Sequence, residues 1–314
     1  MPVAPVIAAI LEQVNAQPAP DVLGTDPEVL RAGQKEMGKS VVPAEPIVVG
    51  SVKDATVPGP AGPVPVRVYR PDTDGPVPTV VFFHGGGWLT GDLDTHDDPC
   101  RRMCRDVGVV VVAVDYRLAP EHPFPAAYDD CLAAAAWVAD HIDDYGGRRD
   151  RLAVAGDSAG GNLAAAVALT FRDEHRPLAA QLLAYPAMDF LATDAEYPSR
   201  VENATGYMLS TQNVLDFEHL YAGDDPAVRG TSRVSPLRAT SLTGVAPAVI
   251  GTAQYDPLRD ECMAYANALK AAGVDVFART YDGLIHTFLN FFPVCPTSDA
   301  AVTELYAQLG KRLA

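Results

Sequence analysis

The stretch from Leu152 to Leu163 limits what this chain can fold into more than any other. It reads Leu-Ala-Val-Ala-Gly-Asp-Ser-Ala-Gly-Gly-Asn-Leu, and an alanine-rich segment follows it. The first four residues indicate a buried strand and the alanines indicate a helix. Between them, Gly156 and Gly160 flank Ser158, and their lack of side chains allows the backbone to reverse in a tight, strained turn. The pattern predicts a strand, a sharp turn and a helix.

Such a turn would lift Ser158 above a sheet and place it at a helix N-terminus. Unpaired backbone N–H groups at that position can face a developing negative charge, so the serine is a candidate nucleophile. The alternative is a glycine- and serine-rich loop without chemistry, which this stretch alone leaves open.

Apolar runs and helical segments alternate along most of the chain. This alternation is typical of an α/β fold with a mostly parallel sheet between helices. Two strand-like runs around a Pro-Gly turn, within residues 47–69, instead predict antiparallel edge strands. Strands are expected at 47–49, 64–69, 79–83, 109–114, 152–155, 180–185, 247–252 and 274–280. Helices are expected at 99–107, 126–142, 158–171, 211–222, 258–271 and 298–313.

Two segments depart from this alternation. Residues 1–45 have helical signals, including the apolar spacing between Val6 and Val14, and a proline-rich connection at 43–46 follows them. Residues 187–240 are rich in turn residues around one predicted helix. We expect an N-terminal helical segment at 1–45 and a catalytic domain at 46–314, with 187–240 as an insertion near the active site.

Composition excludes several classes of protein. The 314 residues are 48% hydrophobic with a mean hydropathy of +0.04, which is typical of a globular protein. A formal net charge of −16 argues against nucleic-acid binding, which needs clustered lysine and arginine. We expect no secretory signal and no membrane span. The five scattered cysteines predict no disulfide framework and favour a reducing, cytoplasmic setting.

A second glycine-rich string, His84-Gly85-Gly86-Gly87-Trp88, follows the predicted strand at 79–83. Consecutive glycines destabilise a chain unless the backbone must approach something closely. One interpretation is an oxyanion hole, in which the amides of Gly85, Gly86 and Ala159 donate to one carbonyl oxygen. The alternatives are a plain turn or a phosphate-binding loop, but no Gly-Lys-Ser/Thr follows as a P-loop would require.

A nucleophilic serine needs a base, and the base needs an orienting group. Among seven histidines, His286 is favoured because it follows the last predicted strand, on a loop where such folds gather functional groups; His122 and His219 come next. Asp256 ends a predicted strand and can serve both as the acid and as a helix N-cap before Pro257. The order serine, acid, histidine is the one expected of an α/β-hydrolase.

Four sequence motifs follow one another along the chain. They are His84–Trp88, Asp115-Tyr116-Arg117-Leu118-Ala119-Pro120-Glu121, Gly156–Gly161 and Asp256-Pro257-Leu258-Arg259-Asp260-Glu261. Together they resemble the bacterial hormone-sensitive-lipase family of carboxylesterases, in its Gly-Asp-Ser-Ala-Gly branch, over about residues 65–290. The resemblance implies an α/β-hydrolase fold, no cofactor, and a helical cap over the acyl pocket that the helices before residue 45 suit.

The resemblance also implies residue roles. The catalytic triad would be Ser158, Asp256 and His286, and the oxyanion donors would be Gly85, Gly86 and Ala159. Thr287 departs from the family pattern, which has glycine there, and a β-branched residue is expected to change the loop geometry. Trp88, Asp157 and Tyr185 are candidates for the substrate pocket. For Trp88 the alternative is plain packing, and for Asp157 it is a structural contact beneath the turn.

Other motifs have simpler interpretations. His96, Cys100 and Cys104 recur every four residues, which would align them on one helical face and suggests a metal site. No carboxylate-rich shell or Cys-x-x-Cys supports that reading, so we expect no metal and thiols that pack as small hydrophobes. Arg117 and Glu121 are expected to brace neighbouring loops.

These observations predict a serine carboxylesterase acting on short- to medium-chain esters through an acyl-enzyme. An amidase or deacetylase using the same triad is the alternative, because the same site serves both reactions. A non-catalytic small-molecule receptor is a further alternative, although such receptors commonly lose a triad residue and this chain keeps all three. The expected partner is a small-molecule ester, with a homodimer left open.

Overall fold

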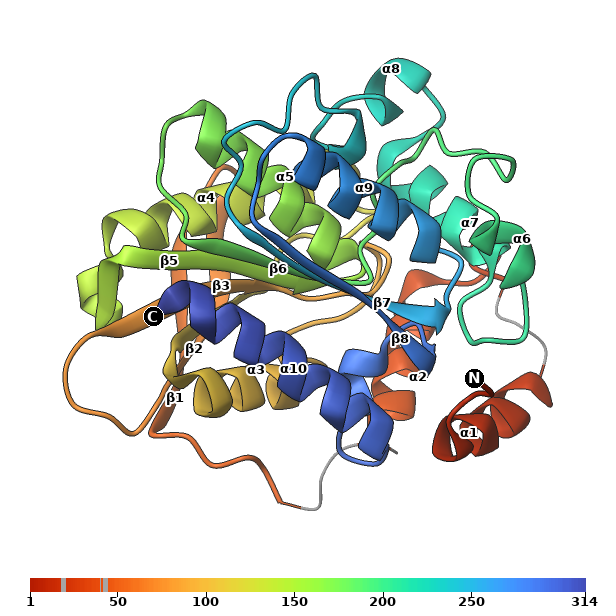
Figure 1. The fold of residues 1–314 in the computed structure, drawn as a ribbon, viewed down its shortest axis with the longest axis horizontal. Helices are drawn as coiled ribbons and strands as arrows, with labels where there is room; N and C mark the ends of the chain where they lie inside the picture. Colours follow the sequence, from red (N-terminus) through yellow and green to blue (C-terminus); the bar gives the residue numbers. More distant parts are fainter. Residues whose placement is uncertain (18–20, 40, 42–44) are drawn as a thin grey trace.

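An eight-stranded sheet forms the centre of the computed structural model, which describes residues 1–17, 21–39, 41 and 45–314 (Figure 1). The strand order is β1-β2-β4-β3-β5-β6-β7-β8. β2 pairs antiparallel with β1 and β4, and all other neighbours are parallel. The strands are β1 (Ser51–Gly59), β2 (Gly62–Arg70), β3 (Val77–Phe83), β4 (Val110–Val114), β5 (Gly147–Asp157), β6 (Ala180–Ala184), β7 (Ala248–Tyr255) and β8 (Val276–Ile285). The predicted mostly parallel sheet with an antiparallel edge is confirmed.

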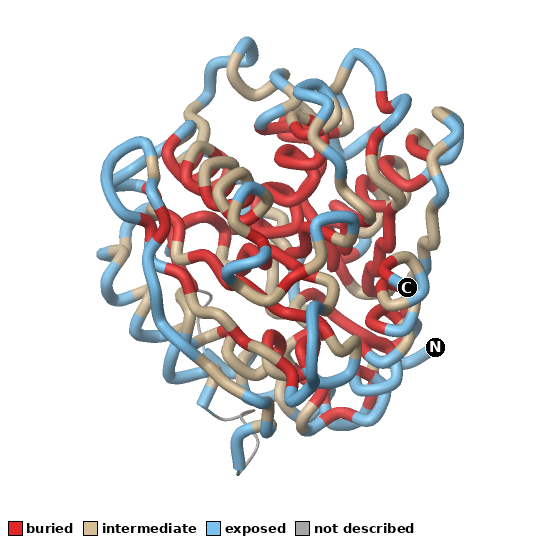
Figure 2. Tube along the Cα trace, turned by 90° about the vertical axis from the view of Figure 1, so that its left-hand side faces the viewer, coloured by how far each residue is buried: buried red, intermediate tan, exposed pale blue. Residues whose placement is uncertain are grey.

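Helices cover both faces of this sheet, so successive residues of β3 enter opposite cores. Val81 and Phe83 pack on the face of α4 (Ala126–Asp140), α5 (Ala159–Asp173) and α9 (Arg259–Ala271). Val80 and Phe82 pack on the face of α3 (Asp97–Met103) and α10 (Pro296–Leu313). Buried backbone therefore runs through the middle of the molecule, with exposed loops around it (Figure 2).

Some boundaries differ from the predictions. The run at 47–49 lies before β1, and Val48 is 84% exposed, because the strand that pairs with β2 is Ser51–Gly59. β5 begins at Gly147, five residues before the strand predicted at 152–155. The proline-rich connection at 43–46 falls partly outside the described residues, since 43 and 44 are not among them.

The N-terminal segment and the insertion contain the remaining α-helices. α1 (Pro5–Asn15) buries Ile7 and Leu11, whereas α2 (Pro27–Lys39) buries no residue. The predicted helix at 211–222 is α7 (Thr211–Ala222). Two four-residue helices were not predicted, because such short turns have no periodicity; they are α6 (Ser199–Glu202) and α8 (Pro226–Arg229). Within the described ranges, no helix has the length and apolarity that crossing a membrane requires.

Candidate active site

Ser158 lies between the end of β5 and the first residue of α5, as the opening motif predicts. Its backbone has φ 51° and ψ −119°, a conformation that side chains rarely adopt. The bond from its N–H to the carbonyl oxygen of Ala184, at 2.8 Å, anchors this turn to the end of β6. The strained turn leaves the Ser158 side chain only half-buried.

Asp256 and His286 converge on Ser158 from the carboxyl ends of β7 and β8. Nε2 of His286 lies 2.9 Å from the hydroxyl oxygen of Ser158, and Nδ1 lies 2.7 Å from Oδ2 of Asp256. The second carboxylate oxygen of Asp256 accepts the N–H of Leu258 at 2.8 Å, so this side chain both orients the imidazole and caps the turn before α9. Three groups distant in sequence therefore form one hydrogen-bonded row.

The alternative bases are placed elsewhere. His219 is 47% exposed and pairs with Asp224 at 2.9 Å. His122 is exposed, and its N–H bonds to the carbonyl oxygen of Leu118. His286 is the predicted base that the structure brings to Ser158.

Gly85, predicted as an oxyanion donor, has its amide engaged elsewhere. Its N–H donates to Oδ1 of Asp157 at 2.8 Å, and its carbonyl oxygen lies 2.9 Å from Nδ1 of His84. Since the one amide proton of Gly85 already has a carboxylate partner, the prediction for this residue is wrong.

The amides of Gly86 and Gly87 have no backbone or side-chain acceptor among the described residues. Gly87 has φ 61°, and a Cβ there would lie 2.6 Å from the ring of Phe217, so only glycine fits. Ala159 is the first residue of α5, where the helix leaves its amides unpaired. Gly87 was missed because a run of glycines does not reveal which amide is already bonded.

The three pocket candidates lie in different environments. Asp157 is 1% exposed and Tyr185 is fully buried, so neither forms a substrate-facing wall, and their assignment to the pocket is wrong. The ring of Tyr185 instead packs on the imidazole of His286, with centroids 4.7 Å apart. Trp88 stacks on Tyr221 at 4.7 Å, so it does pack, and its contact with substrate stays a prediction.

Thr287, the departure from the family pattern, occupies a position that favours glycine. Its φ is 65° in the left-handed region, which is strained for a β-branched residue. Its hydroxyl donates to the carbonyl oxygen of His286 at 2.6 Å. The other residues besides glycine with positive φ angles are Trp88, Ser158, Tyr185 and Met208, together with His175 at the far end of α5.

The residues considered for a metal do not converge. His96 faces Asp157, with its Nε2 3.2 Å from Oδ1. Cys100 and Cys104 are buried in the core under α3, where burial raises the pKa of both thiols. No group of three ligating side chains suited to a metal occurs in the part of the chain that the structure describes.

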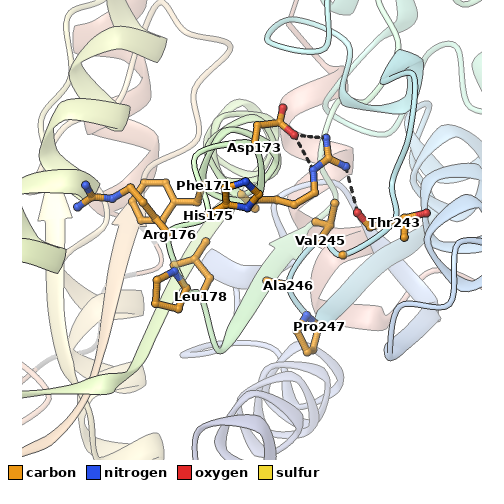
Figure 3. Close-up of a pocket in the computed structure, with 13 residues that line it drawn as sticks. Phe171, Asp173, His175, Arg176, Leu178, Thr243, Val245, Ala246 and Pro247 are labelled. Carbon is orange, nitrogen blue, oxygen red and sulfur yellow. Dashed lines mark hydrogen bonds and ion pairs between the residues drawn. The ribbon is translucent and has the colours of Figure 1, made fainter.

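Two cavities bear on where substrate could bind. One of about 350 Å³ lies between α2 and the catalytic domain, and Thr287, Met208 and Phe291 form part of its wall. A larger one of about 710 Å³ lies at the far end of α5 from Ser158, around His175 and Pro247 (Figure 3). α5 has 15 residues and therefore spans about 22 Å, so the larger cavity is remote from the candidate chemistry.

Comparison with known proteins agrees with this geometry. Residues 80–290 match a family described as having the alpha/beta hydrolase fold. The carboxylic ester hydrolase LipN of Mycobacterium tuberculosis is 45% identical over 269 residues, which cover 83% of this chain and 70% of the relative. The ethyl acetate hydrolase of Pseudomonas putida is 38% identical over 256 residues, which cover 80% of this chain and 79% of the relative.

Solved structures show the same fold. The hyperthermophilic esterase of the archaeon Pyrobaculum calidifontis is 40% identical and superposes with a TM-score of 0.93 over 99% of both chains. The motifs, the sheet order and these matches agree with one another. The chain therefore belongs to the alpha/beta-hydrolase family, in its branch of bacterial carboxylesterases related to hormone-sensitive lipase.

Proposed function

We propose that this protein is a serine carboxylesterase in which Ser158 is the nucleophile, His286 the general base and Asp256 the orienting acid. The observation that carries the proposal is the hydrogen-bonded row from Ser158 through His286 to Asp256. The names of the relatives, carboxylic ester hydrolase and ethyl acetate hydrolase, support ester hydrolysis.

The row supports a specific transfer of protons. A carboxylate only accepts hydrogen bonds, so Nδ1 of His286 donates to Asp256 and Nε2 accepts the hydroxyl proton of Ser158. The serine oxygen attacks the ester carbonyl, and the imidazolium then gives the proton to the leaving alcohol. Water, activated by the same imidazole, hydrolyses the acyl-enzyme. Each step needs only the groups of the row.

The amides of Gly86, Gly87 and Ala159 are proposed as the oxyanion hole. Gly85 is left out because its N–H donates to Asp157. Preorganised amides stabilise the tetrahedral oxyanion more than the ground-state carbonyl, and removing one donor typically costs about 3–4 kcal/mol of the barrier. No cofactor enters this scheme.

We further propose that residues 1–45 form a cap over the catalytic domain of residues 46–314, and that the 187–240 insertion completes the pocket wall. Arg31 of α2 supports this arrangement, because it pairs with Glu121 at 2.7 Å and donates to the carbonyl oxygen of Leu89 at 2.9 Å. A cap built from a few short helices favours a pocket of limited depth, and therefore short- to medium-chain acyl groups.

Hydrolysis of p-nitrophenyl esters tests the function. The purified protein is expected to hydrolyse the acetate and butyrate, and Ser158→Ala is expected to abolish the activity. His286→Ala should cause a comparable loss of activity. Full activity in that variant would indicate His219 or His122 as the general base instead. A series from acetate to palmitate measures the acyl preference. Faster cleavage of the matching anilides would favour an amidase instead.

A cytoplasmic location is also proposed. All five cysteines are free thiols and buried, which suits a reducing compartment. Fractionation of the native cells tests the location, and recovery outside the cytoplasm would reject it. A homodimer stays a proposal for size-exclusion chromatography with light scattering.

A further inference from the structure

The carboxylate of Asp157 lies at the junction of the two halves of the proposed active site. Asp157 immediately precedes Ser158, and its Oδ1 accepts the N–H of Gly85 at 2.8 Å, although 72 residues separate the two partners in sequence. One side chain thus ties the turn that carries the nucleophile to the loop that carries the oxyanion amides.

Gly85 is held at both its N–H and its carbonyl group. Asp157 binds its N–H, and Nδ1 of His84 lies 2.9 Å from its carbonyl oxygen. Burial, with the nearby His96, lowers the pKa of His84 to about 4, so its imidazole is neutral at ordinary pH and its Nδ1–H can donate. A Cβ on Gly85 would lie 2.5 Å from Oδ2 of Asp157, which makes glycine necessary for the contact.

His96 orients the carboxylate. Its Nε2 lies 3.2 Å from Oδ1 of Asp157, and the two side chains are 3% and 2% exposed. Its Nδ1 lies 3.0 Å from the hydroxyl of Thr95, whose own proton goes to the carbonyl oxygen of Asp92. Its Nε2 also lies 3.4 Å from the amide nitrogen of Gly85, so the imidazole contacts both partners of the Asp157–Gly85 hydrogen bond.

The carboxylate of Asp157 stays charged although it is buried. Burial by itself raises the pKa of Asp157, but the attraction of His96 and the hydrogen bonds from His96 and Gly85 outweigh it and leave the pKa below its ordinary value. A buried charge is costly unless it is paired, and an apolar side chain would fill this position more cheaply. The pair therefore needs a reason beyond packing.

We propose that Asp157 and His96 are positioning residues that clamp the Gly85 peptide, so that the free amides of Gly86 and Gly87 stay aligned with Ser158 in the transition state. This rests on the proposed function, because it concerns the same oxyanion hole. Neither side chain touches the substrate. A loosened loop should weaken binding of the tetrahedral oxyanion while leaving ground-state binding of the ester nearly unchanged.

The test compares Asp157→Leu with Asp157→Asn, and His96→Leu with His96→Gln, on p-nitrophenyl butyrate. Active sites are counted by end-point titration with a fluorophosphonate, so that any unfolded fraction drops out. Asp157→Leu and His96→Leu should lower kcat per active site by about 10²-fold, as loss of an oxyanion donor does, with KM changed less than about twofold. Asp157→Asn keeps a hydrogen-bond acceptor and His96→Gln keeps a donor, so both variants should retain most of the wild-type kcat.

A transition-state analogue separates positioning from general damage. A boronic acid should bind the two leucine variants more weakly in proportion to their loss of kcat. The control is Asp130→Asn, which removes another buried carboxylate, paired with Arg117 at 2.8 Å, and should keep wild-type kcat per active site. Should Asp157→Leu not fold, the two His96 variants give the result alone.

The proposed clamp would be wrong if His96→Leu kept the wild-type kcat per active site. It would also be wrong if Asp130→Asn lost as much kcat as Asp157→Leu. Ser158→Ala, assayed alongside, separates the two proposals. If it stays active, the proposed function fails. If it is inactive while the Asp157 and His96 variants keep wild-type kcat, only the clamp fails.

Discussion

The two segments beside the active site are attached to it in opposite ways. α2 buries no residue, and it is held through Arg31 on Glu121 and through Lys35, whose ammonium group lies 2.5 Å from Asp92. α7 is buried along one side, and its Tyr221 stacks on Trp88 of the glycine-rich loop. Ion pairs with exposed partners and the half-buried Leu30 dock α2, whereas fully buried side chains dock α7.

This difference in attachment predicts that α2 can move away from the catalytic domain while α7 stays in place. Ion pairs with exposed partners contribute about 0–1 kcal/mol each and weaken in salt, whereas a buried aromatic side chain contributes several kcal/mol. We therefore expect α2 to open for substrate while α7 keeps Phe217 against Gly87. Three substitutions test this contrast.

Truncation of the α7 contact should have the largest effect. Tyr221 is fully buried between Trp88 and Phe124, so Tyr221→Ala should lower the free energy of unfolding by about 3–5 kcal/mol. Urea unfolding measures it. The control is Tyr221→Phe: among the described residues the tyrosine hydroxyl has no hydrogen-bond partner, so its removal should cost little. A loss under about 1 kcal/mol for Tyr221→Ala would show that α7 is loosely attached.

The buried carboxyl group of Glu218 in α7 should make the stability of the protein depend on pH. Glu218 is 1% exposed, and burial, reinforced by Glu261, raises its pKa from 4.5 to about 8 despite the attraction of Arg200. Folding thus keeps a proton that the unfolded chain releases above about pH 4.5. The stabilisation is complete below that pH and is lost as the pH rises to about 8, by up to about 1.4 kcal/mol per pH unit.

Glu218→Gln should remove this dependence. Melting temperatures measured from about pH 5 to about pH 8 should fall more steeply for the wild type than for the variant. Parallel curves would mean that Glu218 is ionised in the folded protein. The matched control is Glu12→Gln in α1, an exposed carboxylate whose removal should leave the slope unchanged.

Removal of the α2 ion pair should have the smallest effect on stability. Arg31→Ala should change the free energy of unfolding by less than about 1 kcal/mol, since Glu121 is 47% exposed. It should raise KM, because α2 covers the cavity beside Thr287. In the wild type, added salt should raise KM in the same way, and in the variant it should have less effect. A KM that neither the substitution nor salt changes would reject α2 as a cover.

The sequence predicts the parts of this protein that depend on local pattern. The apolar runs place β3 to β8, and the helix predicted at 211–222 has the bounds of α7. The run at 47–49 fails because strand position is decided by pairing: nine residues of β1 lie opposite β2, and the apolar run before them has no such partner.

The site residues also divide into those that a local motif reveals and those that only tertiary contacts decide. Ser158, Asp256 and His286 follow strand ends, which a motif reveals, and the structure brings them together. Gly85 could not be told from Gly87 in a run of glycines, because the difference lies in the distant carboxylate of Asp157. Which amide is free is a property of the tertiary structure.

Covalent trapping tests the central claim most directly. The protein is incubated with a fluorophosphonate, and the adduct is located by mass spectrometry of the intact chain and its peptides. We predict one adduct per chain, on Ser158, with none in Ser158→Ala and slow formation in His286→Ala. Stoichiometric labelling of another residue, or equal labelling of Ser158→Ala, would contradict the account.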